Sequence, residues 1–313
     1  MYAHGVQRPV VDGTARVGSV PFRNPVLLAS GIWGESGRSM AEAYRAGAGG
    51  VVTKSIGLSP REGYPNPTVE SLGEWGMLNA MGLPNPGIDR YPEEIAQARS
   101  SGAPLVGSIF GKDAEEFSRL ARAMERTGVV ALELNLSCPH AQGYGSELGQ
   151  DPEEVRAVVR ATKSAVSLPV WAKITPNTHD PAGLAEAAEE AGADAITAIN
   201  TVRALAIDPT LRRPILAHAT GGLSGPAILP VGLACVWSIY ERVRIPIVGV
   251  GGIGSARDAF QYILAGASAV QVGTAVSTHG ISVLGRIAAG LEEEIERGGL
   301  ASVSEACGMA HPR

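Results

Sequence analysis

Residues 246–274 read PIVGVGGIGSARDAFQYILAGASAVQVGT, and this stretch decides the fold. Two short apolar runs, at 246–250 and 269–273, flank a longer segment that ends in Leu264-Ala265-Gly266-Ala267. A glycine just past the end of a helix supplies the left-handed cap. Both runs are apolar nearly throughout rather than alternating, as in parallel strands covered on both faces. The stretch therefore predicts a strand–helix–strand unit of a parallel sheet.

The same pattern repeats along the whole chain. Apolar runs occur at 26–29, 50–53, 104–109, 131–135, 169–174, 195–199, 246–250 and 269–273. Amphipathic segments at 113–122, 151–159 and 180–188 lie between them, and the last two begin with Asp-Pro. An aspartate can cap a helix and a proline fits its first position, so these segments predict helices.

Eight β/α units predict a TIM (β/α)8 barrel, with residues 1–313 forming a single domain because no linker separates a second one. The chief rival is an open, doubly wound sheet. That fold favours a strand–GxGxxG–helix unit near the start of the chain, and none is present.

Composition excludes several classes of protein. The chain has 313 residues, 45% of them hydrophobic, which is enough for one large α/β domain or two ordinary ones. The net charge of −5 and the absence of a long basic stretch argue against nucleic acid as a partner. Three cysteines without a C-x-x-C pair argue against a disulfide framework or a metal centre. No apolar run reaches the roughly 18 residues of a membrane span, and no signal pattern opens the chain, so we expect a cytoplasmic protein.

Two longer inserts, at about 56–88 and 202–228, follow the second and sixth predicted strands. Insertions after strands fall on the C-terminal face, where barrel active sites lie. The residues that close the strands converge on that face. Small, amide-bearing or charged residues stand there: Ser30, Lys54, Ser55, Asn135, Cys138, Lys173, Asn200, Thr201, Gly251, Gly252, Gly273 and Thr274. Seven such sets are difficult to explain by packing alone.

Two pairs of residues after strands seven and eight indicate a phosphate site. Gly251-Gly252 and Gly273-Thr274 occupy the place where barrels commonly bind phosphate through backbone N–H groups. Glycines also make ordinary tight turns between strands and helices, but two pairs at this position favour phosphate.

Lysines and amides suggest a second, polar ligand. Lys54 and Lys173 either extend their charged ends to solvent or pair with anionic groups of a ligand. Asn79 in the first insert, Asn135 and Asn200 offer donors and acceptors together, which suits a ring that bears both C=O and N–H groups. Any one of them, taken alone, is more often a turn residue.

Cys138 stands in Asn135-Leu136-Ser137-Cys138-Pro139-His140, at the end of a predicted buried strand. No His–Asp set accompanies it beyond its neighbour His140, so a thiol-protease interpretation is weak. A general base acting on a carbon acid fits better. Cys235, within a helix-like apolar segment, is expected in the core, and Cys307 in a polar tail is expected to be incidental.

These motifs together resemble class 1 dihydroorotate dehydrogenases, closest to the B-type catalytic subunit, over essentially the whole chain. The specific elements are residues 79–83 (NAMGL), 135–139 (NLSCP), 199–201 (INT), 221–228 (GGLSGPAI), 249–253 (GVGGI) and 272–275 (VGTA). The resemblance implies a TIM barrel that binds FMN and oxidises (S)-dihydroorotate to orotate in pyrimidine biosynthesis.

The resemblance also implies a role for each matching residue. FMN would be held by Ser30, Lys54, Ser55, Asn135, Lys173, Ile199, Gly225, Gly251, Gly252, Gly273 and Thr274, the last four around its phosphate. The pyrimidine would be held by Lys54, Asn79, Ala80, Met81, Gly82, Leu83, Asn135, Asn200 and Thr201. Cys138 would take the proton from C5 while hydride leaves C6 for the flavin, and Lys173 would stabilise the anionic reduced flavin.

The B type implies a separate FAD and [2Fe-2S] subunit that passes electrons to NAD, and thus a dimer or heterotetramer. Cys138 and the lack of an N-terminal extension differ from class 2 enzymes, which use serine and a membrane quinone. Two alternatives stay open. The first is dihydropyrimidine dehydrogenase, an FMN enzyme that reduces uracil, because residues 138–140 with 148–152 also resemble it. In addition, His140 stands where many class 1 members have Asn. A non-catalytic phosphate-ligand barrel would need the two glycine pairs but gives Cys138 no role.

Overall fold

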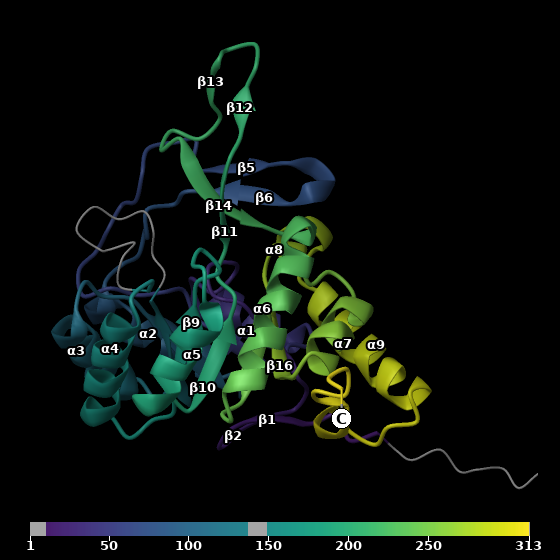
Figure 1. Ribbon diagram of the computed structural model, residues 1–313. Helices are drawn as coiled ribbons and strands as arrows, with labels where there is room; N and C mark the ends of the chain where they lie inside the picture. Colours follow the sequence, from purple (N-terminus) through teal and green to yellow (C-terminus); the bar gives the residue numbers. More distant parts are fainter. Residues whose placement is uncertain (1–10, 137–148, 313) are drawn as a thin grey trace, which may run out of the picture.

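A closed barrel of eight parallel strands forms the centre of the protein (Figure 1). A computed structural model describes residues 11–136 and 149–312. The barrel strands are β3 (Val26–Leu28), β4 (Gly50–Val52), β7 (Leu105–Ile109), β8 (Ala131–Asn135), β9 (Val170–Ile174), β10 (Ala195–Ala198), β15 (Ile247–Val250) and β16 (Ala267–Val272). They follow one another around the barrel in chain order, and β16 pairs with β3 to close it. The predicted TIM barrel is confirmed, and the open doubly wound sheet is wrong.

Helices surround the barrel. Each of the three predicted helices begins directly after the aspartate at the start of its predicted segment. The outer helices are α1 (Gly37–Arg45), α2 (Pro92–Arg99), α3 (Ala114–Glu125), α4 (Pro152–Ala165), α5 (Pro181–Glu190), α6 (Leu229–Arg242), α7 (Ala256–Leu264) and α9 (Val283–Arg297). Asp113, Asp151 and Asp180 each accept a backbone N–H from the first turn of α3, α4 and α5. These caps satisfy donors that have no partner inside the helix.

A short hairpin closes the amino-terminal end of the barrel. Strands β1 (Ala15–Val17) and β2 (Val20–Phe22) lie below it in Figure 1. Val17, Val20 and Phe22 pack in one buried cluster with interior residues of the strands, which include Trp171 of β9. The rings of Phe22 and Trp171 meet edge to face, with centroids 6.2 Å apart. The interior at this end is therefore filled with apolar side chains.

The two inserts build a second sheet over the other end of the barrel. The first contains β5 (Val69–Ser71), β6 (Met77–Asn79) and two short 3₁₀ turns, η1 (Gly73–Trp75) and η2 (Ile88–Arg90). The second contains β11 (Val202–Leu205), β12 (Ile207–Asp208), β13 (Arg213–Pro214), β14 (Thr220–Ser224) and η3 (Pro226–Ile228). Their strands form one antiparallel sheet in the order β11-β14-β6-β5, and the β12–β13 ribbon projects away from it (Figure 1). Both inserts follow barrel strands, as predicted, but the sheet that joins them was not predicted.

The C-terminal part carries α8 (Thr274–His279), directly after β16, and α10 (Val303–Ala306). Cys235 lies buried in α6, as expected, and burial raises the pKa of its thiol to about 11. Cys307 is half-buried at the end of α10, and burial also raises its pKa, so the segment is not the free polar tail that the sequence suggested. No helix in the described ranges is long and apolar enough to cross a membrane.

Candidate active site

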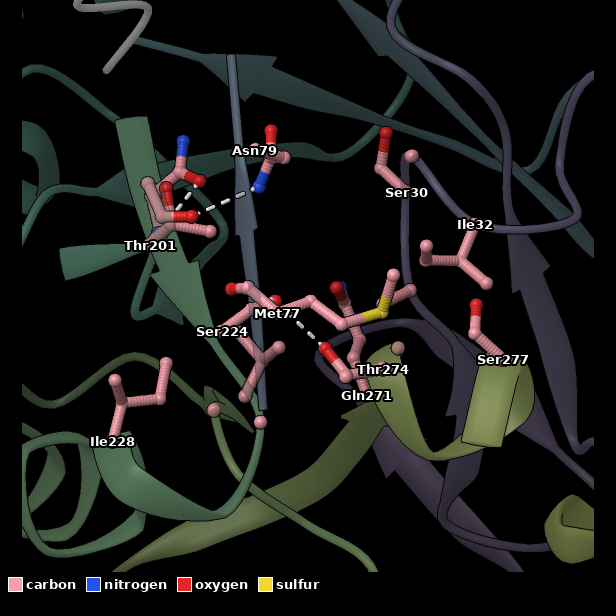
Figure 2. A pocket seen from close by; sticks show the side chains of 18 of the residues that line it. Ser30, Ile32, Met77, Asn79, Thr201, Ser224, Ile228, Gln271, Thr274 and Ser277 are labelled. Carbon is pink, nitrogen blue, oxygen red and sulfur yellow. Dashed lines mark hydrogen bonds between the residues drawn. The ribbon is translucent and has the colours of Figure 1, made fainter. Parts of the chain in front are cut away.

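A cavity of about 480 Å³ opens between the carboxyl ends of the barrel strands and the insert sheet. Figure 2 shows side chains from both parts around it. Nearly all the predicted binding residues that the structure describes line it: Ser30, Lys54, Ser55, Asn79, Met81, Gly82, Leu83, Asn135, Lys173, Ile199, Asn200, Thr201, Gly225, Gly251, Gly252, Gly273 and Thr274. The barrel topology thus brings together side chains from strands that are far apart in the sequence.

One predicted residue lies elsewhere, and two lie outside the described ranges. Ala80 is buried behind the cavity, in a small cluster with Leu78 and Leu216, and does not line it. Successive residues of extended chain point in opposite directions, so Asn79 and Met81 face the cavity while Ala80 faces away. Cys138 and His140 belong to residues 137–148, which the structure does not describe.

Glycines form one wall of the cavity. Gly252 has a φ of 73° and lies so close to Leu229 that a Cβ would stand 2.6 Å from the Leu229 backbone nitrogen. Any side chain there would be strained as well as crowded. The buried hydroxyl of Tyr262 donates to the Gly251 carbonyl at 2.8 Å, and burial raises its pKa, so it stays a neutral donor. These contacts hold the turn between β15 and α7 in one conformation.

Other glycines leave room at the cavity. A Cβ on Gly273 would meet no atom closer than 3.5 Å, and one on Gly254 none closer than 3.9 Å. Nothing in the part of the protein that the structure describes therefore requires these two positions to be bare. Bare backbone facing a cavity beside the start of α8 suits a bound phosphate, because the first N–H groups of a helix have no internal partner.

The insert sheet presents amide and hydroxyl groups to the opposite side of the cavity. Asn79 of β6 donates from Nδ2 to the carbonyl oxygen of Gly222 on β14 at 3.1 Å. A Cβ on Gly222 would stand 2.1 Å from Thr201 Oγ1, so only glycine lets the two strands and Thr201 come this close. The Asn200 side chain accepts the Thr201 backbone N–H at 2.8 Å. The two inserts therefore position Asn79 and Thr201 together.

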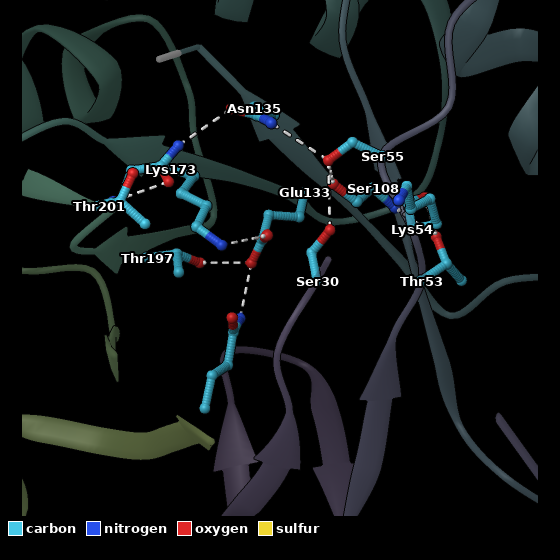
Figure 3. A network of polar contacts seen from close by, with 12 residues as sticks. Ser30, Thr53, Lys54, Ser55, Ser108, Glu133, Asn135, Lys173, Thr197 and Thr201 are labelled. Atoms are coloured by element: carbon cyan, nitrogen blue, oxygen red, sulfur yellow. Dashed lines mark hydrogen bonds and ion pairs between the residues drawn. The ribbon is translucent and has the colours of Figure 1, made fainter. Parts of the chain in front are cut away.

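A chain of polar contacts joins the strand ends across the barrel (Figure 3). Ser30 Oγ lies 3.2 Å from Ser55 Oγ, which also accepts from Asn135 Nδ2 at 3.1 Å. Asn200 Nδ2 donates to Asn135 Oδ1 at 3.3 Å. Each side chain is held by a neighbour, so the amides have defined orientations before any ligand binds.

Both lysines have carboxylate partners from the protein. Lys54 Nζ lies 2.7 Å from Glu35 Oε1, whose side chain is 66% exposed. Lys173 Nζ lies 3.3 Å from Glu133 Oε1, and neither residue is exposed. The two cations at the cavity therefore differ, because solvent screens only the first pair.

Sequence reasoning missed the buried residues below the cavity. Glu133 of β8 has no exposed surface and accepts from Lys173, from Thr197 Oγ1 at 3.0 Å and from Gln271 Nε2 at 2.6 Å. Gln271 lines the cavity beside Lys173. The signal was a charged residue and an amide inside runs that otherwise read as apolar.

Comparison with known proteins identifies the relatives of this chain. The family model for dihydroorotate dehydrogenase matches residues 14–295. A protein named dihydroorotate dehydrogenase B (NAD(+)), catalytic subunit, from Pyrococcus furiosus is 51% identical over 93% of this chain and 96% of the relative. A protein of the same name from Methanocaldococcus jannaschii is 49% identical over the same shares.

A solved structure supports the fold independently. The Eimeria tenella dihydroorotate dehydrogenase, crystallised with ferulenol, superposes with a TM-score of 0.85. The match covers 99% of this chain and 92% of that one, at 24% identity. At this identity the likeness concerns the barrel and its inserts.

Proposed function

This chain belongs to the dihydroorotate dehydrogenase family, and we propose from this premise that it is the catalytic subunit of an NAD-linked B-type enzyme. It oxidises (S)-dihydroorotate to orotate in pyrimidine biosynthesis. The ring loses a proton from C5 and a hydride from C6, so one C–C single bond becomes double. The observation that carries the proposal is the cavity at the barrel mouth, which three asparagines line together with Gly251, Gly252 and Gly273.

The cavity fits FMN, the cofactor that the family implies. FMN supplies a two-electron acceptor for the hydride that leaves C6. Gly251, Gly252, Gly273 and Thr274 would surround its phosphate, and the bare backbone at Gly273 supports this assignment. Gly225 would be a further contact with FMN. The Oε1 of Gln271 has no hydrogen-bond partner among the described residues, which further supports a ligand with an N–H group, because a buried acceptor normally has a donor. The remaining proposed contacts come from Ser30, Lys54, Ser55, Asn135, Lys173 and Ile199.

The pyrimidine would lie between the insert sheet and the strand ends. Asn79, Asn135 and Asn200 would exchange hydrogen bonds with its C=O and N–H groups, and Lys54 would pair with its negative charge. Thr201, Met81, Gly82 and Leu83 line the same space. Ala80 would contribute through its backbone, which connects Asn79 to Met81, and not through its side chain.

Cys138 would remove the proton from C5. A thiolate has a moderate pKa and suits a carbon acid made more acidic by a neighbouring carbonyl group. Asn135 lines the cavity and stands three residues before Cys138 in the sequence.

Electrons would leave through a separate subunit. The two relatives from Pyrococcus furiosus and Methanocaldococcus jannaschii are named catalytic subunits of an NAD(+) enzyme, which supports such a partner. We propose that it carries FAD and a [2Fe-2S] cluster and that the assembly is a dimer or heterotetramer. The single domain over residues 1–313 and the cytoplasmic setting also stay predictions.

An anaerobic titration tests the function directly. The purified protein should be yellow, and its flavin absorbance should bleach when dihydroorotate is added. Dihydrouracil and NADH are the two alternative electron donors, and each is added to a separate sample as a control. Bleaching by dihydrouracil and not by dihydroorotate would favour a dihydropyrimidine dehydrogenase, and a colourless protein without affinity for FMN would favour a phosphate-binding barrel.

A further inference from the structure

A carboxylate lies buried in the barrel interior, below the cavity. Glu133 projects inward from β8, opposite Ser108 of β7 and Trp171 of β9 in the strand register. Figure 3 shows it at the centre of a polar network. It has no exposed surface and does not line the cavity. Its function must therefore be exerted through the residues that it contacts.

Donors from three other barrel strands, β9, β10 and β16, converge on this carboxylate. Lys173 Nζ lies 3.3 Å from one oxygen, and Thr197 Oγ1 and Gln271 Nε2 donate to the other at 3.0 and 2.6 Å. An ionised carboxylate only accepts hydrogen bonds, so this set of partners suits the charged form. A buried ion pair of this kind is weak evidence for stability, since apolar side chains of similar volume fill a core as well.

Two of the three donors line the cavity. Lys173 places a cation there, and Gln271 places an amide whose Oε1 has no hydrogen-bond partner within residues 11–136 and 149–312. Because Glu133 engages the Gln271 nitrogen, the amide oxygen is left for another donor. The pyrimidine edge of a flavin matches these two groups. A ring N–H there suits the acceptor Oε1 of Gln271, and the neighbouring carbonyl, which shares the negative charge of the reduced flavin, suits the cation of Lys173.

We infer that Glu133 is a positioning residue that orients Lys173 and Gln271 toward the flavin and, through its charge, sets the reduction potential of bound FMN. The inference deepens the proposed function and rests on it. With Glu133 the buried pair is neutral, so the charge of Lys173 is partly offset. Without it the charge of Lys173 is offset less and favours the anionic reduced flavin more strongly.

The test measures the midpoint potential of bound FMN by equilibration with reference dyes, which needs no turnover of dihydroorotate. The variants are Glu133→Gln, Lys173→Met and the double variant, which give the pair a charge of +1, −1 and 0. We expect the potential to fall in the order Glu133→Gln, wild type, double variant, Lys173→Met. The equilibrium constant for two-electron reduction should rise about tenfold in Glu133→Gln, which corresponds to about 30 mV.

Glu133→Asp separates charge from packing. It keeps the negative charge in a shorter side chain, so it should stay near the wild-type potential even if it binds FMN more weakly. Should Glu133→Gln fail to fold, the step from Lys173→Met to the double variant removes the same charge and should also raise the potential. A potential that does not change, or that falls, on removal of Glu133 would overturn the inference. A wild-type protein that binds no FMN would instead refute the proposed function.

Discussion

The lower part of the barrel interior, beside the β1–β2 hairpin, is apolar, whereas the upper part, below the cavity, is polar. The same strands supply the residues of both parts. Ala131, Trp171, Ala195 and Ala269 face the interior near the β1–β2 hairpin and pack in an apolar cluster. Two residues further along the same strands stand Glu133, Lys173, Thr197 and Gln271, which form the polar network below the cavity. Side chains two apart on a strand share a face, so both sets point inward. The lower set stabilises the barrel, while the upper set uses buried polar groups that a purely structural core would not need.

The largest effect should come from Cys138→Ser, a change of the residue proposed as the base. A hydroxyl is a far weaker base than a thiolate near neutral pH, so the rate of flavin reduction by dihydroorotate should fall about 10²–10⁴-fold. Stopped-flow absorbance at the flavin band measures this rate. FMN content and the unfolding temperature should stay unchanged, and an unaltered reduction rate would refute the assignment of Cys138 as the base.

Phe22→Ala should have the opposite signature. It opens a hole beside Trp171 at the lower end, so the free energy of unfolding should fall by about 3–5 kcal/mol. The reduction rate of the folded fraction should be unchanged. Urea unfolding followed by fluorescence measures the loss. Leu211→Ala, an exposed apolar position at 58% accessibility, is the control and should change stability by less than about 0.5 kcal/mol.

Asn79→Ala should weaken substrate binding with little effect on the fold. The change removes a side-chain amide that faces the cavity and leaves the Gly222 carbonyl without its donor. We expect KM for dihydroorotate to rise about 10-fold, the equivalent of about 1–2 kcal/mol. Steady-state kinetics measure it. Ser71→Ala, on the exposed neighbouring strand β5, should leave KM as it is, and equal effects of both variants would contradict a specific role for Asn79.

The smallest effect should come from Asp180→Asn, at the outside of the same barrel end. The Gly183 backbone N–H and Arg242 hold the pKa of Asp180 below its usual value of 3.8. A lowered pKa contributes stability that is present above 3.8 and is lost as pH falls through the folded value. Asparagine still caps the helix, and solvent screens the pair, so the loss should be about 0.5 kcal/mol at pH 7. Urea unfolding at pH 7 and pH 3 should show a smaller difference at pH 3, because part of this stabilisation is lost below pH 3.8.

The barrel and most of its mouth could be predicted because they depend on local patterns. Apolar runs mark parallel strands, and the residue after each run falls at the carboxyl end. Lys54, Asn135 and Asn200 were therefore correctly assigned to one site without knowledge of any contact between them. Glu133, Thr197 and Gln271 of the upper interior layer were missed for a related reason, although Lys173 of the same layer was predicted. Glu133 and Gln271 each lie inside a run that is otherwise apolar. Because such a run is assigned to a buried strand by its average hydrophobicity, a single polar residue within it is overlooked.

The insert sheet could not be predicted, because it depends on contacts between distant segments. Asn79 pairs with Gly222, 143 residues away, and nothing local sets that register. Ala80 was assigned to the site because the motif was treated as a continuous block. The alternation of the chain around β6 turns this one residue away from the cavity.

Under the proposed function, the shared insert sheet makes substrate recognition a joint property of two insertions. β6 from the first and β14 from the second are hydrogen-bonded neighbours, and Asn79 and Thr201 meet through them. A chimera that takes one insert from a relative would mismatch the strand register of the other, however similar its local sequence. Grafting a new specificity onto this barrel therefore requires both inserts to be transplanted as a matched pair, while the eight barrel strands can stay as the recipient scaffold.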